Sequence, residues 1–327
     1  MTNTNKIKLG IVGFGNLSRA IIANIGHFND MEIVAVFSRR PSAVTCNYLV
    51  EHVDDIFKHK GKIDIMMMCG GSKDDLPVQS PKIAECFCLI DSFDTHANIP
   101  EHVNKVGEVA QKAKTLATVA IGWDPGLFSL MRVYFDAVLP NGSEYTFWGE
   151  GVSQGHSDAI RRVDGVANGV QYTIPKTEAL NKVRTGSNPI LTTREKHFRK
   201  CFVVAKEGAD KTAIIETIKN MPNYFSDYDT EVNFISQEEF DKNHKKIPHG
   251  GNVIRSGSTG ANGKTKQVAE FSLKLESNPE FTSSVMLAYA RATHRLWKEG
   301  KTGCMTIMDV APKYLTALSE KDLFDKI

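Results

Sequence analysis

Two carboxylate residues follow apolar runs in the first half of the chain. Asp94 comes shortly after the run from Cys86 to Ile90, and Asp124 follows the run from Leu116 to Ile121. Such runs are typical of parallel strands that are covered on both faces, and open α/β sheets bind ligands at the carboxyl ends of their strands. Carboxylates at that edge can stabilise a developing positive charge and transfer protons. We therefore predict that Asp94 and Asp124 meet a cationic group of a substrate.

A glycine-containing turn near the N-terminus indicates a cofactor site. A strand-like run from Ile7 to Val12 leads into a helix-like segment, and a second strand, Ile33 to Phe37, follows. The turn between them reads Gly13, Phe14, Gly15, Asn16 and Leu17. Gly13 permits a tight turn, and Gly15 lets a pyrophosphate approach the N–H groups of the helix. This order predicts a dinucleotide-binding βαβ unit; the alternative is a plain glycine turn, and Ser18 replaces the third glycine of the motif.

The residues after the second strand indicate which dinucleotide is bound. An NAD site has an acidic residue there, whereas an arginine accommodates the 2′-phosphate of NADP. This chain has Ser38, Arg39 and Arg40 at that point. A guanidinium binds phosphate with two parallel hydrogen bonds, and a serine hydroxyl adds a donor. We predict NADP as the cofactor, with an exposed pair of surface arginines as the alternative.

Further cofactor contacts are expected where the later strands end. The apolar run from Ile63 to Met68 stops at a Cys-Gly-Gly-Ser turn, and the runs before Asp94 and Asp124 stop at the same predicted edge. The alternative for Cys69 is an ordinary strand-to-helix turn. The predicted contacts are Cys69, Gly70, Gly71, Ser72, Ser92, Phe93, Asp94, Ile121, Gly122, Trp123, Asp124 and Pro125.

Length and charge narrow the classes of function. The chain has 327 residues, which is natural for two domains. It carries 40 Lys and Arg against 38 Asp and Glu, a formal charge of +2, so the basic excess of a nucleic-acid-binding surface is missing. The first residues are polar up to Asn5 and no run approaches a membrane span. We expect a soluble, cytoplasmic protein without nucleic-acid or membrane partners.

The six cysteines do not suggest a metal or disulfide framework. None of them forms a C-x-x-C pair. We expect buried thiols in a reducing compartment and no metal site.

The order of the predicted elements gives the fold class. We predict an α/β fold, with a Rossmann-type NADP-binding domain over residues 1–122 and a tail from about 300 to 327 that packs back onto it. Beyond a helical segment from Leu127 to Leu139, strands and helices no longer alternate regularly. This indicates an α+β substrate-binding and dimerisation domain over 123–299 with a largely antiparallel sheet. The segments 248–251 and 256–263 are rich in glycine and are interpreted as binding loops.

Several longer motifs carry a specific resemblance. They are Gly-Phe-Gly-Asn-Leu at 13–17, Phe-Ser-Arg-Arg at 37–40, Gly-Trp-Asp-Pro-Gly at 122–126, Thr-Phe-Trp-Gly at 146–149, Ser-Gln-Gly-His-Ser-Asp-Ala at 153–159, Met-Pro-Asn-Tyr-Phe at 221–225 and Pro-His-Gly-Gly at 248–251. Through them the chain resembles, from end to end, the meso-diaminopimelate dehydrogenases, NADP-dependent amino-acid dehydrogenases of bacterial lysine synthesis.

The resemblance implies a reaction and its residues. The expected reaction is the reversible oxidative deamination of the D-centre of meso-2,6-diaminopimelate to L-2-amino-6-oxopimelate, ammonia and NADPH, by a homodimer. Asp94 and Asp124 would stabilise the positive charge on the reacting nitrogen and transfer its protons. Which of the two accepts a proton is left open. Around the reacting centre, Trp123 and Trp148 would shape the pocket, and the backbone of Ser153, Gln154 and Gly155 would hold the carboxylate. The distal L-centre would be held by Thr173, Arg199, His249 and Asn278.

Two other readings stay open at this point. One is a different two-domain NADP reductase of the aspartate-family pathway. The other is a regulator that binds NADP without turning it over, which would not need Asp94, Asp124 and Arg199 at a cleft. The breadth of D-amino-acid specificity and the choice between a dimer and a hexamer are also open.

Overall fold

The computed structural model describes residues 6–327 and divides into two compact units. Unit 1 comprises Met1–Leu130 and Pro279–Ile327, and unit 2 comprises Met131–Asn278. The prediction about the polar segment up to Asn5 lies outside the described residues. Among residues 6–327, none of the helices combines the length and the apolar character that a membrane crossing requires.

Unit 1 is built on a seven-stranded parallel sheet with the strand order β14-β6-β5-β4-β1-β2-β3. Its strands are β1 (Ile7–Val12), β2 (Met31–Ser38), β3 (Leu49–His52), β4 (Ile65–Met68), β5 (Cys88–Asp91), β6 (Leu116–Thr118) and β14 (Gly303–Met305). The Rossmann-type fold is confirmed, and β1, the turn and β2 form the predicted βαβ unit.

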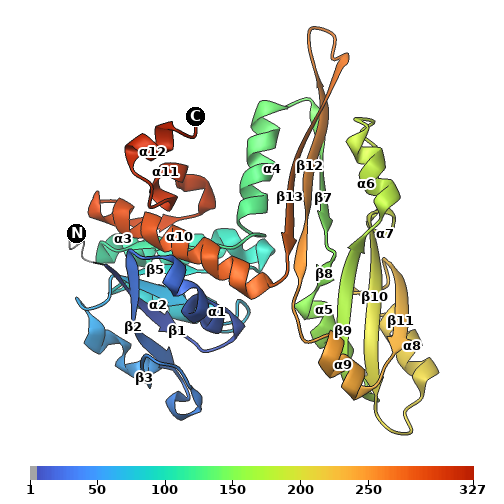
Figure 1. Ribbon diagram of the computed structural model, residues 1–327, viewed down its shortest axis with the longest axis horizontal. Coiled ribbons are helices and arrows are strands. Elements are labelled where there is room, and N and C mark those ends of the chain that lie inside the picture. Colours follow the sequence, from blue (N-terminus) through green and yellow to red (C-terminus); the bar gives the residue numbers. More distant parts are fainter. Residues whose placement is uncertain (1–5) are drawn as a thin grey trace. The chain divides into compact units, whose positions relative to one another are not determined.

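Helices cover both faces of this sheet, which is why its strands read as continuous apolar runs. On one face Leu9 and Ile11 pack with Ile21 and Met286, which come from α1 (Asn16–Asn24) and α10 (Asn278–Lys298) (Figure 1). On the other face Met66 packs against residues of α2 (Leu76–Ala84) and α3 (Ile99–Ala113). The unit also contains α11 (Pro312–Leu315), α12 (Glu320–Phe324) and short 3-10 helices at Ile25–His27, Pro41–Ala43, Val53–His59, His96–Asn98 and Ile307–Asp309.

The boundaries of the units differ from the predicted ones at 122 and 299. The first boundary lies after Leu130, inside α4 (Leu127–Val138), and the second lies after Asn278, at the start of α10. Residues 279–299 therefore belong to unit 1, because the buried side chains of α10 complete the core on one face of its sheet. Helical periodicity predicts that such a helix has an apolar face, but it does not reveal which sheet covers that face. The tail follows α10 and contributes β14, which pairs with β6.

Unit 2 contains two sheets, and its largely antiparallel character is confirmed. The four-stranded sheet has the order β11-β10-β9-β8 and the three-stranded sheet the order β13-β12-β7. Only the β10 and β11 pair is parallel among the strand pairs of the described residues in this unit. The strands are β7 (Gly142–Trp148), β8 (Gly151–Val152), β9 (Val166–Pro175), β10 (His197–Ala205), β11 (Asp229–Phe234), β12 (His249–Thr259) and β13 (Thr265–Leu275).

Helices close the apolar face of each sheet in unit 2. Ile160 of α5 (Gln154–Arg161) and Ile214 of α8 (Lys211–Lys219) pack on Val203 of the four-stranded sheet. Val183 of α6 (Thr177–Arg184) packs with Phe147 of the three-stranded sheet. The remaining helices are α7 (Thr193–Lys196) and α9 (Gln237–Asn243).

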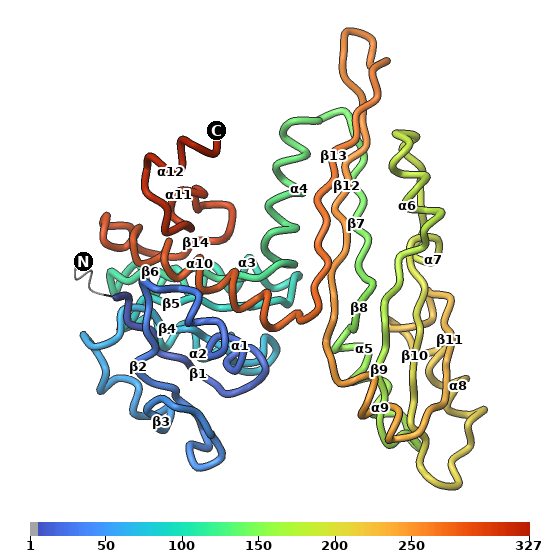
Figure 2. The backbone as a smooth tube through the Cα atoms, in the orientation of Figure 1, coloured from blue at the N-terminus to red at the C-terminus, as the bar shows by residue number. Residues whose placement is uncertain are grey.

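Residues 249–251 and 256–259 of the two predicted binding loops belong to a strand, so the prediction of a loop is wrong for these residues. Residues 249–259 form β12, the central strand of the three-stranded sheet, and Figure 2 shows it running beside β13 as a long hairpin. The glycines are required by close backbone contacts in this strand. Gly250 has a φ of +144°, and a Cβ there would lie 2.1 Å from the carbonyl oxygen of Leu273. Glycine-rich sequence lowers the strand signal at the positions where this sheet has no room for side chains.

Candidate active site

The glycine turn has the geometry of a dinucleotide site. Gly13 has a φ of +99°, and a Cβ there would lie 3.2 Å from the carbonyl oxygen of Cys69. Gly15 stands just before α1, and apart from its two chain neighbours no residue comes within 4 Å of where its Cβ would be. The N–H groups of the first turn of α1 are therefore open to an approaching phosphate. Ser18, at the third glycine position, is buried and its hydroxyl donates to the carbonyl of Gly13 at 3.0 Å, which fixes the turn to the helix.

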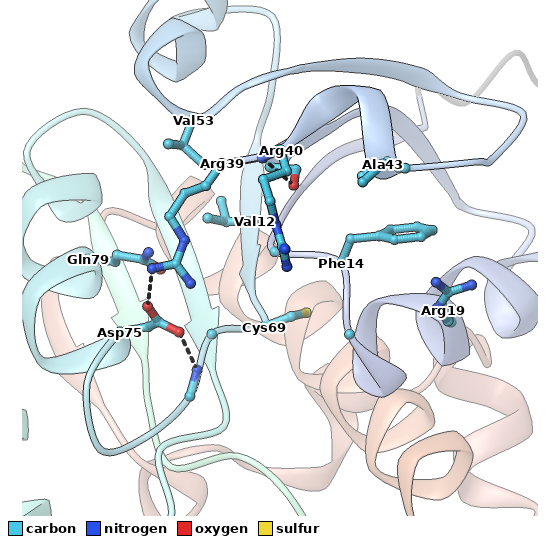
Figure 3. A pocket seen from close by; sticks show the side chains of 16 residues that line it. Val12, Phe14, Arg19, Arg39, Arg40, Ala43, Val53, Cys69, Asp75 and Gln79 are labelled. Atoms are coloured by element: carbon cyan, nitrogen blue, oxygen red, sulfur yellow. Dashed lines mark hydrogen bonds and ion pairs between the residues drawn. The ribbon is translucent and has the colours of Figure 1, made fainter.

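A cavity of about 650 Å³ opens beside this turn, and the two arginines line it (Figure 3). Arg39 Nη1 lies 3.3 Å from Asp75 Oδ1, and Asp75 Oδ2 accepts a hydrogen bond from the Gly71 N–H at 3.0 Å. The backbone N–H of Arg40 donates to Ser38 Oγ at 3.1 Å. Asp75 was not predicted, since a single Asp in a loop gives no signal of its role. It fixes the orientation of one arginine in the cavity.

About half of the predicted cofactor residues line this cavity. Arg19, which the sequence did not indicate, also lines it, with its guanidinium 4.4 Å from the centre of the Phe14 ring. Burial raises the pKa of the Cys69 thiol to about 12, so this side chain lines the cavity as a neutral group. The predicted residues on the lining are Gly13, Phe14, Gly15, Ser38, Arg39, Arg40, Cys69, Gly70 and Gly71. The predicted residues beyond this lining are Asn16, Leu17, Ser72, Ser92, Phe93, Asp94, Ile121, Gly122, Trp123, Asp124 and Pro125.

The two predicted catalytic carboxylates leave the same edge of the sheet of unit 1. Strands β5 and β6 are parallel neighbours, and Asp94 and Asp124 follow them. Asp94 is exposed, and its N–H donates to Ser72 Oγ at 3.1 Å. Asp124 lies in a tight turn in which Gly126, with a φ of +137°, comes so close to the carbonyl of Gly122 that a Cβ would be 1.8 Å from its oxygen.

In unit 2 a buried arginine lies beside a threonine on adjacent strands. Arg199 of β10 is opposite Thr173 of β9 and donates a hydrogen bond to its hydroxyl. Arg199 is 6% exposed, and its guanidinium lies 3.8 Å from the centre of the Tyr228 ring. Burial lowers its pKa, and its Nε has no hydrogen-bond partner among the described residues. A buried cation with an unpaired donor is suited to bind an anionic group of a ligand.

Two other side chains complete this corner and were not predicted. Gln171, fully buried on β9, donates from Nε2 to Thr173 Oγ1 at 3.2 Å, while its Oε1 has no partner among the described residues. Tyr228 lies beneath the guanidinium of Arg199. A period of two along β9 places Gln171 and Thr173 on one face, so the sequence offered a signal for Gln171; Tyr228 offered none.

The structure brings His249 and Asn278 close to the same corner. Gly151 of β8 is opposite Thr173, and a Cβ on Gly151 would lie 2.4 Å from the Cα of His249. The N–H of Asn278 donates to the carbonyl of Ile247 at 2.9 Å, two residues before His249. The predicted distal set of Thr173, Arg199, His249 and Asn278 thus lies in one region of unit 2.

Trp148 is held by a histidine that the sequence did not single out. The N–H of Trp148 donates to Nε2 of His197 at 2.9 Å, and their rings stack with centres 5.6 Å apart. Burial, together with the nearby charge of Arg199, lowers the pKa of His197 to about 3. The ring is therefore neutral near pH 7 and can accept this hydrogen bond. Trp148 itself is 38% exposed.

Of the three backbone N–H groups at 153–155 that were predicted to hold a carboxylate, one is already used within the protein. The N–H of Ser153 is used by the carbonyl of Gln171 at 3.1 Å. Gln154 and Gly155 are exposed in the first turn of α5, where N–H groups lack intrahelical partners. The Ser153 hydroxyl is instead paired with Nδ1 of His156 at 2.8 Å, and burial, with the nearby charge of Arg199, lowers the pKa of His156 to about 4. Two donors, from Gln154 and Gly155, remain for a carboxylate.

Residues 6–327 contain no group of three or more His, Cys, Asp or Glu side chains that could hold a metal ion. The parallel sheet of unit 1, the cavity beside its glycine turn and the carboxylates that follow β5 and β6 define the class of protein as a two-domain dehydrogenase with a dinucleotide-binding domain.

Comparisons with known proteins narrow this class. Residues 122–277 match the family model for the diaminopimelic acid dehydrogenase C-terminal domain. A meso-diaminopimelate D-dehydrogenase of Ureibacillus thermosphaericus is 55% identical over 98% of this chain and 98% of its own. The structure of the Corynebacterium glutamicum DAP dehydrogenase in complex with DAP has 44% identity and a TM-score of 0.91, over 99% of each chain. An engineered D-amino acid dehydrogenase bound to NADP+ has 42% identity and a TM-score of 0.85, over 98% of this chain and 99% of its own.

The chain belongs to the meso-diaminopimelate D-dehydrogenase family. It is an oxidoreductase that acts on a CH–NH₂ group.

Proposed function

We propose that this protein catalyses the reversible, NADP-dependent oxidative deamination of the D-centre of meso-2,6-diaminopimelate, giving L-2-amino-6-oxopimelate, ammonia and NADPH in lysine synthesis. Family membership supports the reaction. The cavity beside the glycine turn of unit 1 supports the cofactor, and the buried arginine of unit 2 supports a substrate with a second carboxylate.

The electron balance of the reaction defines what the side chains must do. NADP+ held beside the glycine turn by Arg39 and Arg40 would supply the hydride acceptor. The substrate Cα loses its hydrogen together with the electron pair of the C–H bond, and the substrate becomes an iminium. Water then adds to this carbon, and the carbinolamine breaks its C–N bond to release ammonia and the oxo acid. Asp94 and Asp124 stabilise the cationic nitrogen and transfer protons between nitrogen and water. Both follow strands that end at one edge of the sheet.

The other groups at the reacting end bind and orient. The N–H groups of Gln154 and Gly155 hold the carboxylate next to the reacting carbon. The indole rings of Trp123 and Trp148 limit the space around that carbon, so that one configuration presents its hydrogen. His197 fixes Trp148 for this purpose through its ring nitrogen.

The observation that carries the proposal is the buried Arg199, which stacks on Tyr228 and whose Nε donor has no partner among the described residues. Burying a charge without an opposite charge is costly, so its retention in the sheet supports a role in binding a carboxylate. A simple amino acid has one carboxylate, whereas diaminopimelate has a second one at its far end. Thr173, His249 and Asn278 complete the hydrogen bonding of that distal L-centre.

The choice of NADP is part of the proposal. In this class of fold the ribose 2′-substituent binds at the end of β2. Two arginines and a serine stand there in this chain, where an NAD site has a carboxylate. We also propose a homodimer, assembled through unit 2, from the family resemblance.

The test is a spectrophotometric assay at the absorbance band of reduced nicotinamide. NADP with meso-diaminopimelate should yield NADPH and an equal amount of ammonia, and NADP alone should yield neither. A regulator that only senses NADP would bind the cofactor and produce no NADPH with any diaminopimelate, which would contradict the proposal.

A further inference from the structure

We infer that Asp91 and His102 form a positioning pair that fixes the two loops carrying Asp94 and Asp124. The inference rests on the proposed function for the role of those loops, and on the hydrogen bonds of unit 1 for the pair itself. Neither residue belongs to the predicted site. Both are buried, with Asp91 0% and His102 4% exposed.

The carboxylate of Asp91 joins four separate parts of unit 1. Oδ1 accepts hydrogen bonds from the N–H of Phe93 at 3.2 Å and the N–H of Ala120 at 3.0 Å. Oδ2 accepts from the hydroxyl of Ser80 at 2.8 Å and from Nε2 of His102 at 2.7 Å. A carboxylate has about four lone-pair sites, so its acceptor capacity is fully used by α2, α3 and two loops.

Two of these four donors are the backbone groups that lead into the catalytic loops. Phe93 immediately precedes Asp94, and Ala120 lies four residues before Asp124. Ala120 has a φ of +57°, which is uncommon for a residue other than glycine. The carbonyl of Asp91 also accepts from the N–H of Ile121 at 2.9 Å. One residue therefore fixes where both loops leave the sheet.

His102 fixes the same loop in a second way. Its ring stacks on the ring of Phe93, with centres 4.2 Å apart and planes inclined by 15°. Because the carboxylate only accepts, Nε2 of His102 carries the hydrogen of their bond. The histidine thereby holds both the Asp91 carboxylate and the Phe93 side chain, next to Asp94.

The chemistry gives a reason for a polar pair at this place. For stability alone, an apolar side chain of similar volume usually serves as well as a buried charged pair. Apolar contacts are not directional, however, and they do not fix two backbone N–H groups relative to one another. An error of about 1 Å in the placement of reacting groups can lower a rate by about 10²-fold. A buried carboxylate with directional bonds to both loops meets that requirement.

Three variants test the inference. His102→Phe keeps a ring against Phe93 but removes the donor to Asp91, and His102→Gln restores a donor of similar reach. The matched control is Val106→Ala, a buried apolar change one turn further along α3. We expect His102→Phe to lower kcat for meso-diaminopimelate by about 10- to 100-fold per folded enzyme, with the Kd for NADPH changed by less than about threefold, and His102→Gln to recover most of kcat. The control should lower the Tm and leave kcat unchanged.

A second measurement does not depend on activity. Amide hydrogen exchange followed by NMR should be accelerated by His102→Phe at both Phe93 and Ala120, and the control should not show this selective effect. The inference is overturned if folded His102→Phe has wild-type kcat, if the control loses kcat equally, or if protection of both amides is unchanged. A wild-type enzyme without activity would contradict the proposed function, and the exchange result would still decide whether the pair holds the loops.

Discussion

The guanidinium of Arg199 lies 3.8 Å from the centre of the Tyr228 ring, and it also donates a hydrogen bond to the hydroxyl of Thr173. An aromatic face stabilises a cation without neutralising it. None of the ion pairs between described residues includes Arg199, and its Nε lacks a partner. The arginine is thus held in place and still able to bind a carboxylate.

Replacing this arginine should weaken substrate binding and leave cofactor binding intact. We expect Arg199→Met to raise KM for meso-diaminopimelate by about one to two decades, because a charged hydrogen-bonded contact contributes roughly 1.5–3 kcal/mol. Steady-state kinetics gives KM, and a fluorescence titration gives the Kd for NADPH. Arg184→Met is the matched control, since Arg184 pairs with Glu270 at the surface of the same unit; it should leave KM unchanged. An unchanged KM in Arg199→Met would remove this residue from the site.

The two arginines after β2 should determine the preference for NADP. In the double variant Arg39→Asp with Arg40→Ala, the Kd for NADP should rise by about two decades while that for NAD changes much less, because only NADP carries the 2′-phosphate. Titrations with both cofactors measure this difference. The exposed Lys112→Ala controls for loss of a positive charge elsewhere on unit 1. Equal weakening of both cofactors would count against the assignment.

The carboxylates should be needed for the chemical step. Asp94→Asn and Asp124→Asn should each lower kcat by about 10²- to 10⁴-fold, the usual range for a lost acid or base, and neither should change the Kd for NADPH by more than a few-fold. Stopped-flow measurement of NADPH formation separates this step from product release. Asp74→Asn, an exposed change in the loop after β4, should behave as the wild type. If both variants kept full kcat, neither residue would take part in proton transfer.

His197 should make the protein sensitive to acid. Its pKa is lowered from 6.5 to about 3 by burial and by Arg199, so between these values the unfolded chain binds a proton that the folded chain does not. The contribution of His197 to the free energy of unfolding is therefore fully present above about pH 6.5. It falls as the pH is lowered and is smaller by about 2 kcal/mol at pH 5. Urea unfolding at pH 7 and pH 5 measures the loss.

The matched variant for this prediction is His197→Gln, which keeps an acceptor for the N–H of Trp148 and does not titrate. Its loss of stability between pH 7 and pH 5 should be smaller than that of the wild type by about 2 kcal/mol. His27→Gln, at an exposed position, serves as the control. An identical loss in His197→Gln and the wild type would show that His197 does not cause the acid sensitivity.

Local sequence patterns predicted the elements of unit 1 well. The strand from Ile7 to Val12 and the turn around Gly13 appear with the expected bounds, because strand propensity, apolar runs and glycine spacing all act over a few neighbouring residues. The same patterns could not assign α10 to unit 1, since the partner of an apolar helix face is chosen by packing. They also concealed β12, whose Gly250 and Gly251 are required by neighbouring backbones.

Local sequence patterns likewise predicted only part of the candidate site. That Arg39 and Arg40 would lie beside the glycine turn was predictable, because residues directly after β2 have a fixed place in this fold. Asp75, His197 and Tyr228 act through partners far away in the sequence, and nothing in the residues next to them indicates those partners. The roles of Arg199 and Thr173 came from the family resemblance, and the structure adds that the two residues are hydrogen-bonded neighbours on adjacent strands.

The most direct test of the proposed reaction compares the three stereoisomers of diaminopimelate, each with NADP, by the rate of NADPH formation. The meso isomer has both the D-centre at which we propose oxidation and the L-centre that we propose Arg199 and Thr173 bind, so it should be turned over. The LL isomer has no D-centre and should give no NADPH, and the DD isomer should react poorly because its far end has the wrong configuration. NADPH formation from the LL isomer at a rate equal to that from the meso isomer would contradict the account.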